Sequence, residues 1–231
     1  MVKIKFTTLL MLMLLIQSCS VKNNLHKEPP VEIKEAEKIW GIDISHYQEI
    51  VDWNKLREQE PGFIFVKATE GSTFQDPKYT EYYKTIRKLD IPVGSYHFFT
   101  YKTSGKDQAK NFLSVVKYQH GDLPLVLDAE FAKTMPEKGI VRKELQEFMT
   151  IVYNKTGIYP IIYCAYKYYN TYLRDCLPTD CKLWIVDYKS KPDCNWTFWQ
   201  TTEKYKVGGI KGYVDFNLFY GSKKKLKSLL Y

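Results

Sequence analysis

The feature that most constrains the fold of this chain is a repeated alternation of short apolar runs with helix-like segments. Strand-like runs occur at residues 38–45, 63–69, 91–99, 123–130, 160–165, 182–188, 197–202 and 213–221, and helical patterns at 51–59, 76–90, 105–118, 141–157 and 166–173. Apolar strands that alternate with helices form parallel sheets buried on both faces. Eight such strands with about five helices predict an α/β fold, an irregular (β/α) TIM-like barrel. An open doubly wound sheet is the alternative.

Local signals at two helix ends support these boundaries. Asp76 is placed to cap the segment 76–90, with Pro77 at its first helical position. Gly157 is placed to end the segment 141–157. No G-x-G-x-x-G motif opens any of the helices, so we expect no dinucleotide and no other cofactor.

The N-terminus predicts export. Residues 1–18 carry Lys3 and Lys5 and then an apolar core, Leu9 to Ile16, which is too short to span a membrane and is typical of a signal peptide. Cys19 follows Ser18 as in a bacterial lipoprotein cleavage site, and the polar residues 19–38 form a lipid-anchored tether to a barrel domain at 39–231. We therefore expect a lipoprotein of the cell envelope, anchored in a membrane at Cys19; secretion with a free Cys19 is the alternative.

Four further cysteines, Cys164, Cys176, Cys181 and Cys194, form an even set in a chain that is expected to be exported. One or two disulfides are therefore allowed, and Cys176 with Cys181 is the favoured pair. The chain has no CxxC, H-E-x-x-H or H-x-H motif, so we predict no metal site.

The net charge of +8 suits an anionic polymer or a membrane surface. Removal of residues 1–18 with their two lysines leaves about +6, and part of this charge lies in the basic tail at 223–227. A solvated tail would explain that part equally well. The 19 tyrosines could stack on bases, but no nucleic-acid motif accompanies them, so we expect no nucleic acid as partner.

Polar side chains gather where the predicted strands end. They are Asp43, Lys67, Glu70, Tyr96, His97, Asp128, Glu130, Trp199, Gln200, Asp215 and Asn217. In barrels of parallel strands, the chemistry lies at this rim. Asp128 and Glu130 are two residues apart, so in a strand their side chains share one face. Two carboxyl groups that lie so close together cannot both ionise cheaply, and the pKa of one of them should rise. A carboxyl that stays protonated near neutral pH is what a general acid requires.

Six motifs, in this order, resemble glycoside hydrolase family 25, the lysozymes that cut the glycan of peptidoglycan. They are GIDISHYQ (41–48), FVKATEG (65–71), GSYHFF (94–99), LVLDAE (125–130), FWQ (198–200) and GYVDFN (212–217), and the resemblance covers roughly residues 39–221. It implies an irregular β/α barrel and N-acetylmuramidase activity, cleaving the β-1,4 bond between N-acetylmuramic acid and N-acetylglucosamine. It also implies Glu130 as general acid and Asp128, Asp43 and Asp215 as the other catalytic carboxyls.

The role of the second carboxyl stays open at this point. Asp128 could orient the substrate's own N-acetyl group as nucleophile, or Asp43 or Asp215 could activate water. We expect the substrate to be bound by Lys67, Glu70, Tyr96, His97, Tyr163, Trp199, Gln200 and Asn217. The partner would be peptidoglycan glycan strands, and the protein a monomer. A chitinase-like glycosidase and an inactive cell-wall-binding module are the alternatives.

Overall fold

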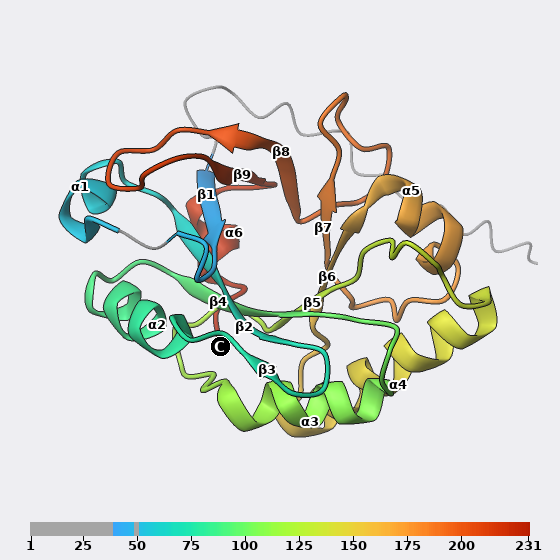
Figure 1. The fold of residues 1–231 in the computed structure, drawn as a ribbon. Helices are drawn as coiled ribbons and strands as arrows, with labels where there is room; N and C mark the ends of the chain where they lie inside the picture. Colours follow the sequence, from blue (N-terminus) through green and yellow to red (C-terminus); the bar gives the residue numbers. More distant parts are fainter. Residues whose placement is uncertain (1–38, 49–50) are drawn as a thin grey trace, which may run out of the picture. The chain divides into compact units, whose positions relative to one another are not determined.

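A computed structural model of the protein describes residues 39–48 and 51–231 as a closed β-barrel surrounded by helices (Figure 1). The predicted signal peptide, Cys19 and the tether lie outside the described residues. The barrel strands are β1 (Ile39–Ile44), β2 (Phe63–Glu70), β4 (Val93–Phe98), β5 (Val126–Asp128), β6 (Ile161–Ala165), β7 (Leu183–Val186), β8 (Phe198–Tyr205) and β9 (Val214–Phe219). A short strand, β3 (Phe74–Gln75), pairs with the end of β2. The predicted irregular α/β barrel is confirmed.

Closure comes from β1, which pairs with β2 on one side and with β9 on the other. The neighbouring pairs from β1 to β8 are parallel, whereas β9 runs antiparallel to both β8 and β1. The sequence pattern did not predict this reversal. It brings the beginning of β9 to the same edge of the barrel as the ends of the parallel strands.

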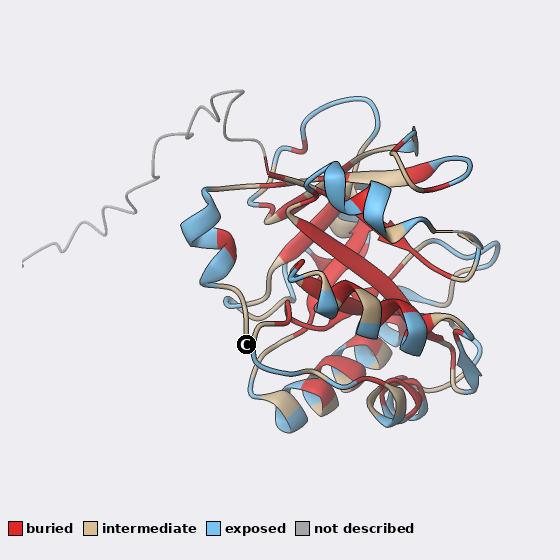
Figure 2. Ribbon diagram, turned by 90° about the vertical axis from the view of Figure 1, so that its left-hand side faces the viewer, coloured by how far each residue is buried: buried red, intermediate tan, exposed pale blue. Residues whose placement is uncertain are grey.

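Helices cover the outside of the parallel strands. They are α1 (Trp53–Glu58), α2 (Tyr79–Lys88), α3 (Gly105–Val115), α4 (Lys138–Thr156) and α5 (Tyr166–Tyr168), which continues into the π-helical turn η2 (Tyr169–Leu173). A further helix, α6 (Lys223–Lys227), follows the last strand. Figure 2 shows that the buried residues of these helices face the sheet and that their outer faces are exposed. Among the described residues, no helix is long and apolar enough to cross a membrane.

Strand alternation divides the apolar residues into two cores. Side chains on the outer face of the strands pack between the sheet and the helices. Those on the inner face fill the barrel, as expected for an eight-stranded barrel. Aromatic rings dominate the interior, where Phe65 stacks on Trp184 with 4.4 Å between centroids. Gly41 and Gly94 make room for this packing, because a Cβ at either position would clash with the ring of Phe63 or Phe65.

The helix ends agree with the predictions at one position and differ at another. Gly157 ends α4 in the left-handed conformation, with φ of 76°, as predicted. Asp76 does not cap α2, which begins at Tyr79. Its carboxylate instead accepts hydrogen bonds from the backbone N–H of Lys78 and from both the backbone and the ring of His46.

The basic segment at 223–227 is helix α6 and not a free tail. Leu226 is buried in the barrel interior together with Ile39, and Ser222 caps the helix by accepting from the backbone N–H of Lys225. Helix α6 therefore closes the barrel at the end where β1 begins, and its lysine side chains stay exposed.

The disulfides that the sequence allowed are not formed, because Cys164, Cys176, Cys181 and Cys194 are all free thiols. Cys176 donates to the carbonyl of Tyr172 and Cys181 to the carbonyl of Pro160, so the thiols of the favoured pair have different partners. Burial raises the pKa of Cys181 to about 12, which keeps this thiol protonated and unreactive.

Candidate active site

A cavity of about 240 Å³ opens at the barrel edge where the parallel strands end. This central cavity is lined by Asp43, Ile44, Ser45, Tyr47, Gln48, Lys67, Tyr96, Phe98, Asp128, Glu130, Tyr163, Trp184 and Asp215. All four predicted catalytic carboxyls therefore meet in one place. Asp43 comes from β1 and Asp128 from the last position of β5, with Glu130 two residues further. Asp215 reaches the same edge because it lies near the start of the antiparallel strand β9, opposite Asp43.

Two side-chain amides hold the carboxylate of Asp43 in place. Asn217 Nδ2 and Gln200 Nε2 donate to Asp43 Oδ2 over 2.8 and 3.2 Å. The indole N–H of Trp184, which can only donate, bonds to Asn217 Oδ1 over 2.7 Å and so fixes the orientation of that amide. Both amides thus present N–H groups to Asp43, and this favours its ionised form.

Gln200 is oriented in the same way by two tyrosines. The hydroxyls of Tyr163 and Tyr188 both donate to Gln200 Oε1 over 2.9 Å. Gln200 and Asn217 were predicted to bind substrate, but their amides are buried and engaged with Asp43. Their role in the structure is to position a carboxylate, and Tyr163 contributes both to this network and to the cavity wall.

Asp43 and Asp215 form a hydrogen-bonded pair that shares a proton. Burial, the charge of Asp43 and the hydrogen bond that Asp215 donates to it raise the pKa of Asp215 to about 9. Burial also raises the pKa of Asp43, but the bonds from Asn217, Asp215 and Gln200 oppose that rise. Near neutral pH we therefore place the proton on Asp215 and the negative charge on Asp43.

Asp128 and Glu130 both have raised pKa values. Burial is the main cause for Asp128, followed by the charges of Glu130 and Asp43. For Glu130 the cause is again burial, followed by the neighbouring carboxyl of Asp215. The Asp128 Oδ1 atom is buried and makes no hydrogen bond within the described residues. It is an acceptor inside the cavity that a ligand could use.

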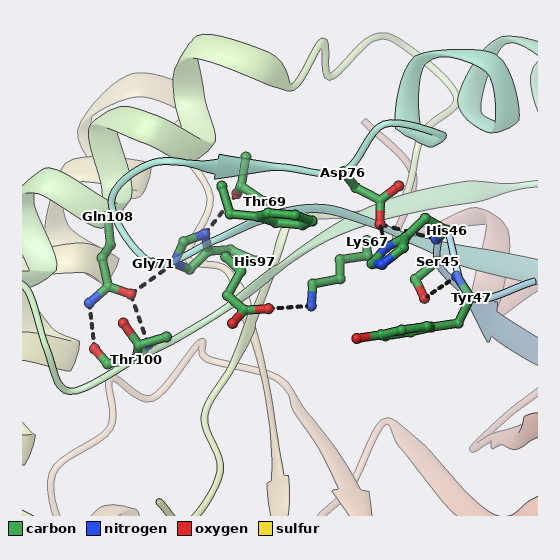
Figure 3. Close-up of polar contacts among 12 residues, drawn as sticks. Ser45, His46, Tyr47, Lys67, Thr69, Gly71, Asp76, His97, Thr100 and Gln108 are labelled. Carbon is green, nitrogen blue, oxygen red and sulfur yellow. Dashed lines mark hydrogen bonds and ion pairs between the residues drawn. The ribbon is translucent and has the colours of Figure 1, made fainter.

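Lys67 supplies the positive charge of the central cavity. Its ammonium group pairs with Glu70 over 2.7 Å and lies 4.9 Å from the centroid of the Phe98 ring. Figure 3 shows the Lys67 side chain extending between the segment of Ser45 and Tyr47 and that of Gly71. Its charge lowers the pKa of Asp128 and of Glu130 and so opposes the effect of burial. Glu70 itself does not line the central cavity but borders a neighbouring one.

Two further predicted binding residues, His97 and Trp199, lie on the outer face of the barrel, away from the cavity. His97 is fully buried between β4 and the helices, where its ring stacks on Phe148. Trp199 packs against Trp196 on the outside of β8, and its indole N–H donates to the carbonyl of Asp187. Each follows a residue whose side chain points into the barrel, Tyr96 in β4 in the one case and Phe198 in β8 in the other, so strand alternation turns both away from the cavity.

His97 holds a neutral, defined tautomer. Gln108 Nε2 donates to the carbonyls of Thr100 and Thr103, so Gln108 Oε1 accepts from His97 Nε2 over 3.1 Å. The hydroxyl of Thr69 then donates to His97 Nδ1 over 2.7 Å. Burial lowers the pKa of His97 to about 3, which excludes an acid–base role at neutral pH.

Several cavity residues were missing from the predicted set. Ser45, Tyr47 and Gln48 lie in the loop that follows β1, and Phe98 and Trp184 come from β4 and β7. The loop residues belong to the motif GIDISHYQ, so the motif contained the signal for them. Strand alternation could have identified Trp184, because its side chain lies on the inner face of β7, with the other residues that fill the barrel.

The arrangement suits general acid catalysis at a glycosidic bond. It combines a carboxyl with raised pKa, further carboxyl groups within one cavity, and walls of tyrosine and tryptophan. Among the described residues, no three His, Cys, Asp or Glu side chains are grouped so that they could hold a metal ion.

Comparison with known proteins identifies the family. The chain matches Glycosyl hydrolases family 25 over residues 42–210. The uncharacterized protein YegX of Escherichia coli K12 is 33% identical over 209 residues, which are 87% of this chain and 76% of the relative. Lysozyme M1 of Streptomyces globisporus is 29% identical over 208 residues, 83% of this chain and 71% of the relative.

Solved structures agree. A family 25 glycosyl hydrolase from Bacillus anthracis superposes with a TM-score of 0.80 at 32% identity, covering 86% of this chain and 96% of that one. The bacterial lysozyme from Streptomyces coelicolor has a TM-score of 0.78 at 28% identity, covering 83% and 96%. The chain is therefore a glycoside hydrolase and belongs to glycosyl hydrolases family 25.

Proposed function

We propose that the protein is a lysozyme that hydrolyses peptidoglycan at the β-1,4 bond between N-acetylmuramic acid and N-acetylglucosamine. The observation that carries this proposal is Glu130, a carboxyl with raised pKa that shares a cavity with Asp43, Asp128 and Asp215. The relatives support the choice of substrate. Besides Lysozyme M1, they include an N,O-diacetylmuramidase of Arthroderma benhamiae that is 29% identical over 216 residues.

Glu130 is the general acid of the proposed reaction. Burial keeps its carboxyl protonated to a higher pH than an exposed glutamic acid. It gives this proton to the glycosidic oxygen as the bond to the anomeric carbon breaks, and the leaving chain departs with a free hydroxyl. Its carboxylate then takes a proton from the water that attacks the anomeric carbon.

Asp128 assists through the substrate's own acetamido group. In this route the acetamido oxygen attacks the anomeric carbon, and an oxazolinium ring forms while the leaving chain departs. The N–H of the ring needs an acceptor, and the unpartnered Asp128 Oδ1 supports this role. The negative charge of Asp43 stabilises the positive charge that develops on the sugar.

The alternative, activation of water by Asp43 or Asp215, fits the site less well. A base must be unprotonated, yet the pKa of about 9 leaves the proton on Asp215 near neutral pH. Asp43 is ionised, but Asn217 and Gln200 both donate to its Oδ2 atom. These donors lower its basicity.

A direct test of function measures the clearing of purified peptidoglycan beside the release of soluble products from chitin. We expect the wild type to clear peptidoglycan, and reduction of the products with borohydride to convert their new ends into muramitol. The variant Glu130→Gln should lose about 10²–10⁴-fold in rate, with Glu137→Gln, an exposed glutamate, as the control. Cleavage of chitin alone would favour the chitinase-like alternative, and binding without cleavage the inactive module.

The anomer released in the first minutes tests the mechanism. The acetamido route displaces twice at the anomeric carbon and so predicts net retention, which proton NMR of early products can read. Net inversion would eliminate this route and indicate a water activated by Asp43 or Asp215.

We also propose that the protein is exported and anchored through a lipid on Cys19, with residues 20–38 as the tether. This proposal rests on the sequence pattern of residues 1–19.

A further inference from the structure

A second cavity, the side cavity, adjoins the central one. It has a volume of about 410 Å³ and lies between the loop that follows β4 and the loop that follows β5. Phe98 and Glu130 line both cavities. The ion pair of Lys67 with Glu70 also bridges them, because Lys67 lines the central cavity and Glu70 the side cavity. Glu130 thus stands on the boundary between two binding spaces.

This position assigns a direction to the bound glycan. A general acid protonates the oxygen that joins two sugars, so it must lie between the sites of those sugars. The sugar whose anomeric carbon becomes positive belongs in the central cavity, beside Asp43, Asp128 and Asp215. We propose that the side cavity binds the leaving sugar; given the proposed function, on which this inference rests, that sugar is an N-acetylglucosamine unit.

Phe131 gives the side cavity a platform for a sugar ring. Phe131 is 43% exposed, and it follows directly after Glu130 in the chain. The ring is supported from behind by Tyr168 and Tyr172, at centroid distances of 5.2 and 6.0 Å. A supported, half-exposed aromatic ring offers an apolar surface at low entropic cost, which suits the apolar face of a pyranose.

The other wall of the side cavity is held by hydrogen bonds, most of them made by the buried side chain of Gln108. Gln108 accepts from the backbone N–H of Thr100 over 2.9 Å and donates to the carbonyl of Thr100 (Figure 3). It also donates to the carbonyl of Thr103. Gln108 is itself fixed by His97. The hydroxyl of Tyr101 donates to the carbonyl of Glu130 over 3.2 Å, which ties this wall to the backbone of the general acid. The side cavity and Glu130 are thus built as one unit.

The experiment compares two substrates that differ only in the leaving group. One is the glycan chain, and the other is the β-fluoride of the disaccharide that ends in N-acetylmuramic acid, whose leaving fluoride cannot fill the side cavity. Phe131→Ala should lower kcat/KM for the chain about tenfold, equivalent to about 1.4 kcal/mol, and leave hydrolysis of the fluoride unchanged. Phe131→Tyr should restore the rate on the chain. The control is Tyr153→Ala, which removes a similarly exposed ring from α4.

Two results would overturn the inference: equal losses on both substrates, or no loss on either. A binding measurement covers the case of slow turnover. In the Glu130→Gln background, Phe131→Ala should weaken binding of a tetrasaccharide that spans both cavities but not of the disaccharide. If the wild type cleaves chitin oligosaccharides and not peptidoglycan, the proposed function fails on its own. The same comparison, with chitobiosyl fluoride, then still decides the role of the side cavity.

Discussion

At the scale of single residues, Trp184 shows how one hydrogen-bond donor can influence the charge of a carboxyl group that lies two hydrogen bonds away. Its indole N–H can only donate, so it fixes the Asn217 oxygen and turns the Asn217 amino group toward Asp43. Asp43 is thereby favoured as the anion, and Asp215 keeps the proton that the pair shares. The division of roles between two identical side chains follows from their neighbours.

This shared proton predicts a stability that depends on pH. With a pKa of about 9, folded Asp215 retains a proton that the unfolded chain releases near pH 4. The folded state therefore binds more protons between these values, and its stability falls as the pH rises from about 4 to about 9. In Asp215→Asn an amide replaces the protonated carboxyl, donates to Asp43 in its place and loses no proton.

We expect Asp215→Asn to be inactive and yet more stable than the wild type at pH 8, by about 1–2 kcal/mol, or roughly 2–4 °C in Tm per kcal/mol. The gain should grow between pH 5 and pH 8 in thermal unfolding experiments. Asp193→Asn, at an exposed position, is the control. A difference in Tm that does not change with pH would contradict the assigned proton.

Lys67 predicts a shift in the pH dependence of activity. Its positive charge lowers the pKa of Glu130, so its removal in Lys67→Met should raise that pKa. Glu130 would then stay protonated to higher pH, and the alkaline limb of the pH profile of kcat/KM would shift to higher pH. Lys67→Arg keeps the charge and should keep the limb in place. If the alkaline limb of Lys67→Met stays in place or shifts to lower pH, Glu130 is not the acid whose pKa this limb reports.

At the scale of the elements, strand alternation explains which site residues could be predicted from the sequence. Asp43, Lys67, Tyr96, Asp128 and Tyr163 line the cavity because each has the inward parity of its strand. The predicted binding residues His97 and Trp199 have the outward parity. A strict period of two, counted along β4 from Tyr96, would have excluded His97 from sequence alone.

The antiparallel direction of β9 could also have been predicted, from the length of the loop that precedes it. Only residues 206–213 separate β8 from β9. A parallel crossover needs about a dozen residues or more, so this connection can only form a hairpin. The contact of Asp76 with His46 could not be predicted in this way. His46 lies 30 residues away in the loop that follows β1, and the local sequence favours a helix cap instead.

The contact between Asp76 and His46 joins two elements and predicts a loop that depends on it. The buried Asp76 carboxylate accepts from the backbone and ring of His46 over 3.1 and 2.7 Å. These bonds hold the loop whose residues Ser45, Tyr47 and Gln48 line the central cavity. Figure 3 shows Asp76 and His46 side by side, next to Ser45 and Tyr47.

Asp76→Ala should therefore raise KM more than it lowers kcat, because the cavity wall loosens while Glu130 and Asp128 stay in place. We also expect a loss of about 1–3 kcal/mol in the free energy of unfolding, since buried donors lose their acceptor. Asp76→Asn retains a carbonyl acceptor and should recover part of both effects. Steady-state kinetics and urea unfolding provide the measurements. A fall in kcat at constant KM would contradict the proposed role of the loop.

At the scale of the whole molecule, the barrel separates its two ends. The central cavity lies where the parallel strands end, whereas Ile39, the first residue of β1, is buried beside Leu226 at the other end. The alternation of apolar and helical segments was sufficient to predict this barrel, because it reflects burial of the sheet on both faces. Residues 1–38 lie outside the described part of the chain, so the anchor remains a prediction from sequence.

That anchor predicts a covalent lipid on Cys19. The apolar residues Leu9 to Ile16 followed by Ser18 and Cys19 favour cleavage before the cysteine and acylation of its thiol. Bacteria that express the full chain and are fed an alkyne fatty acid should label the wild type and Cys176→Ala, which lacks an exposed thiol of the barrel, but not Cys19→Ala. The purified wild type should also partition into detergent. Because the chain enters the barrel at the end opposite the cavity, lipidated and unlipidated protein should hydrolyse soluble glycan fragments at equal rates. Wild-type protein that carries no label would rule out the anchor and leave secretion with a free Cys19.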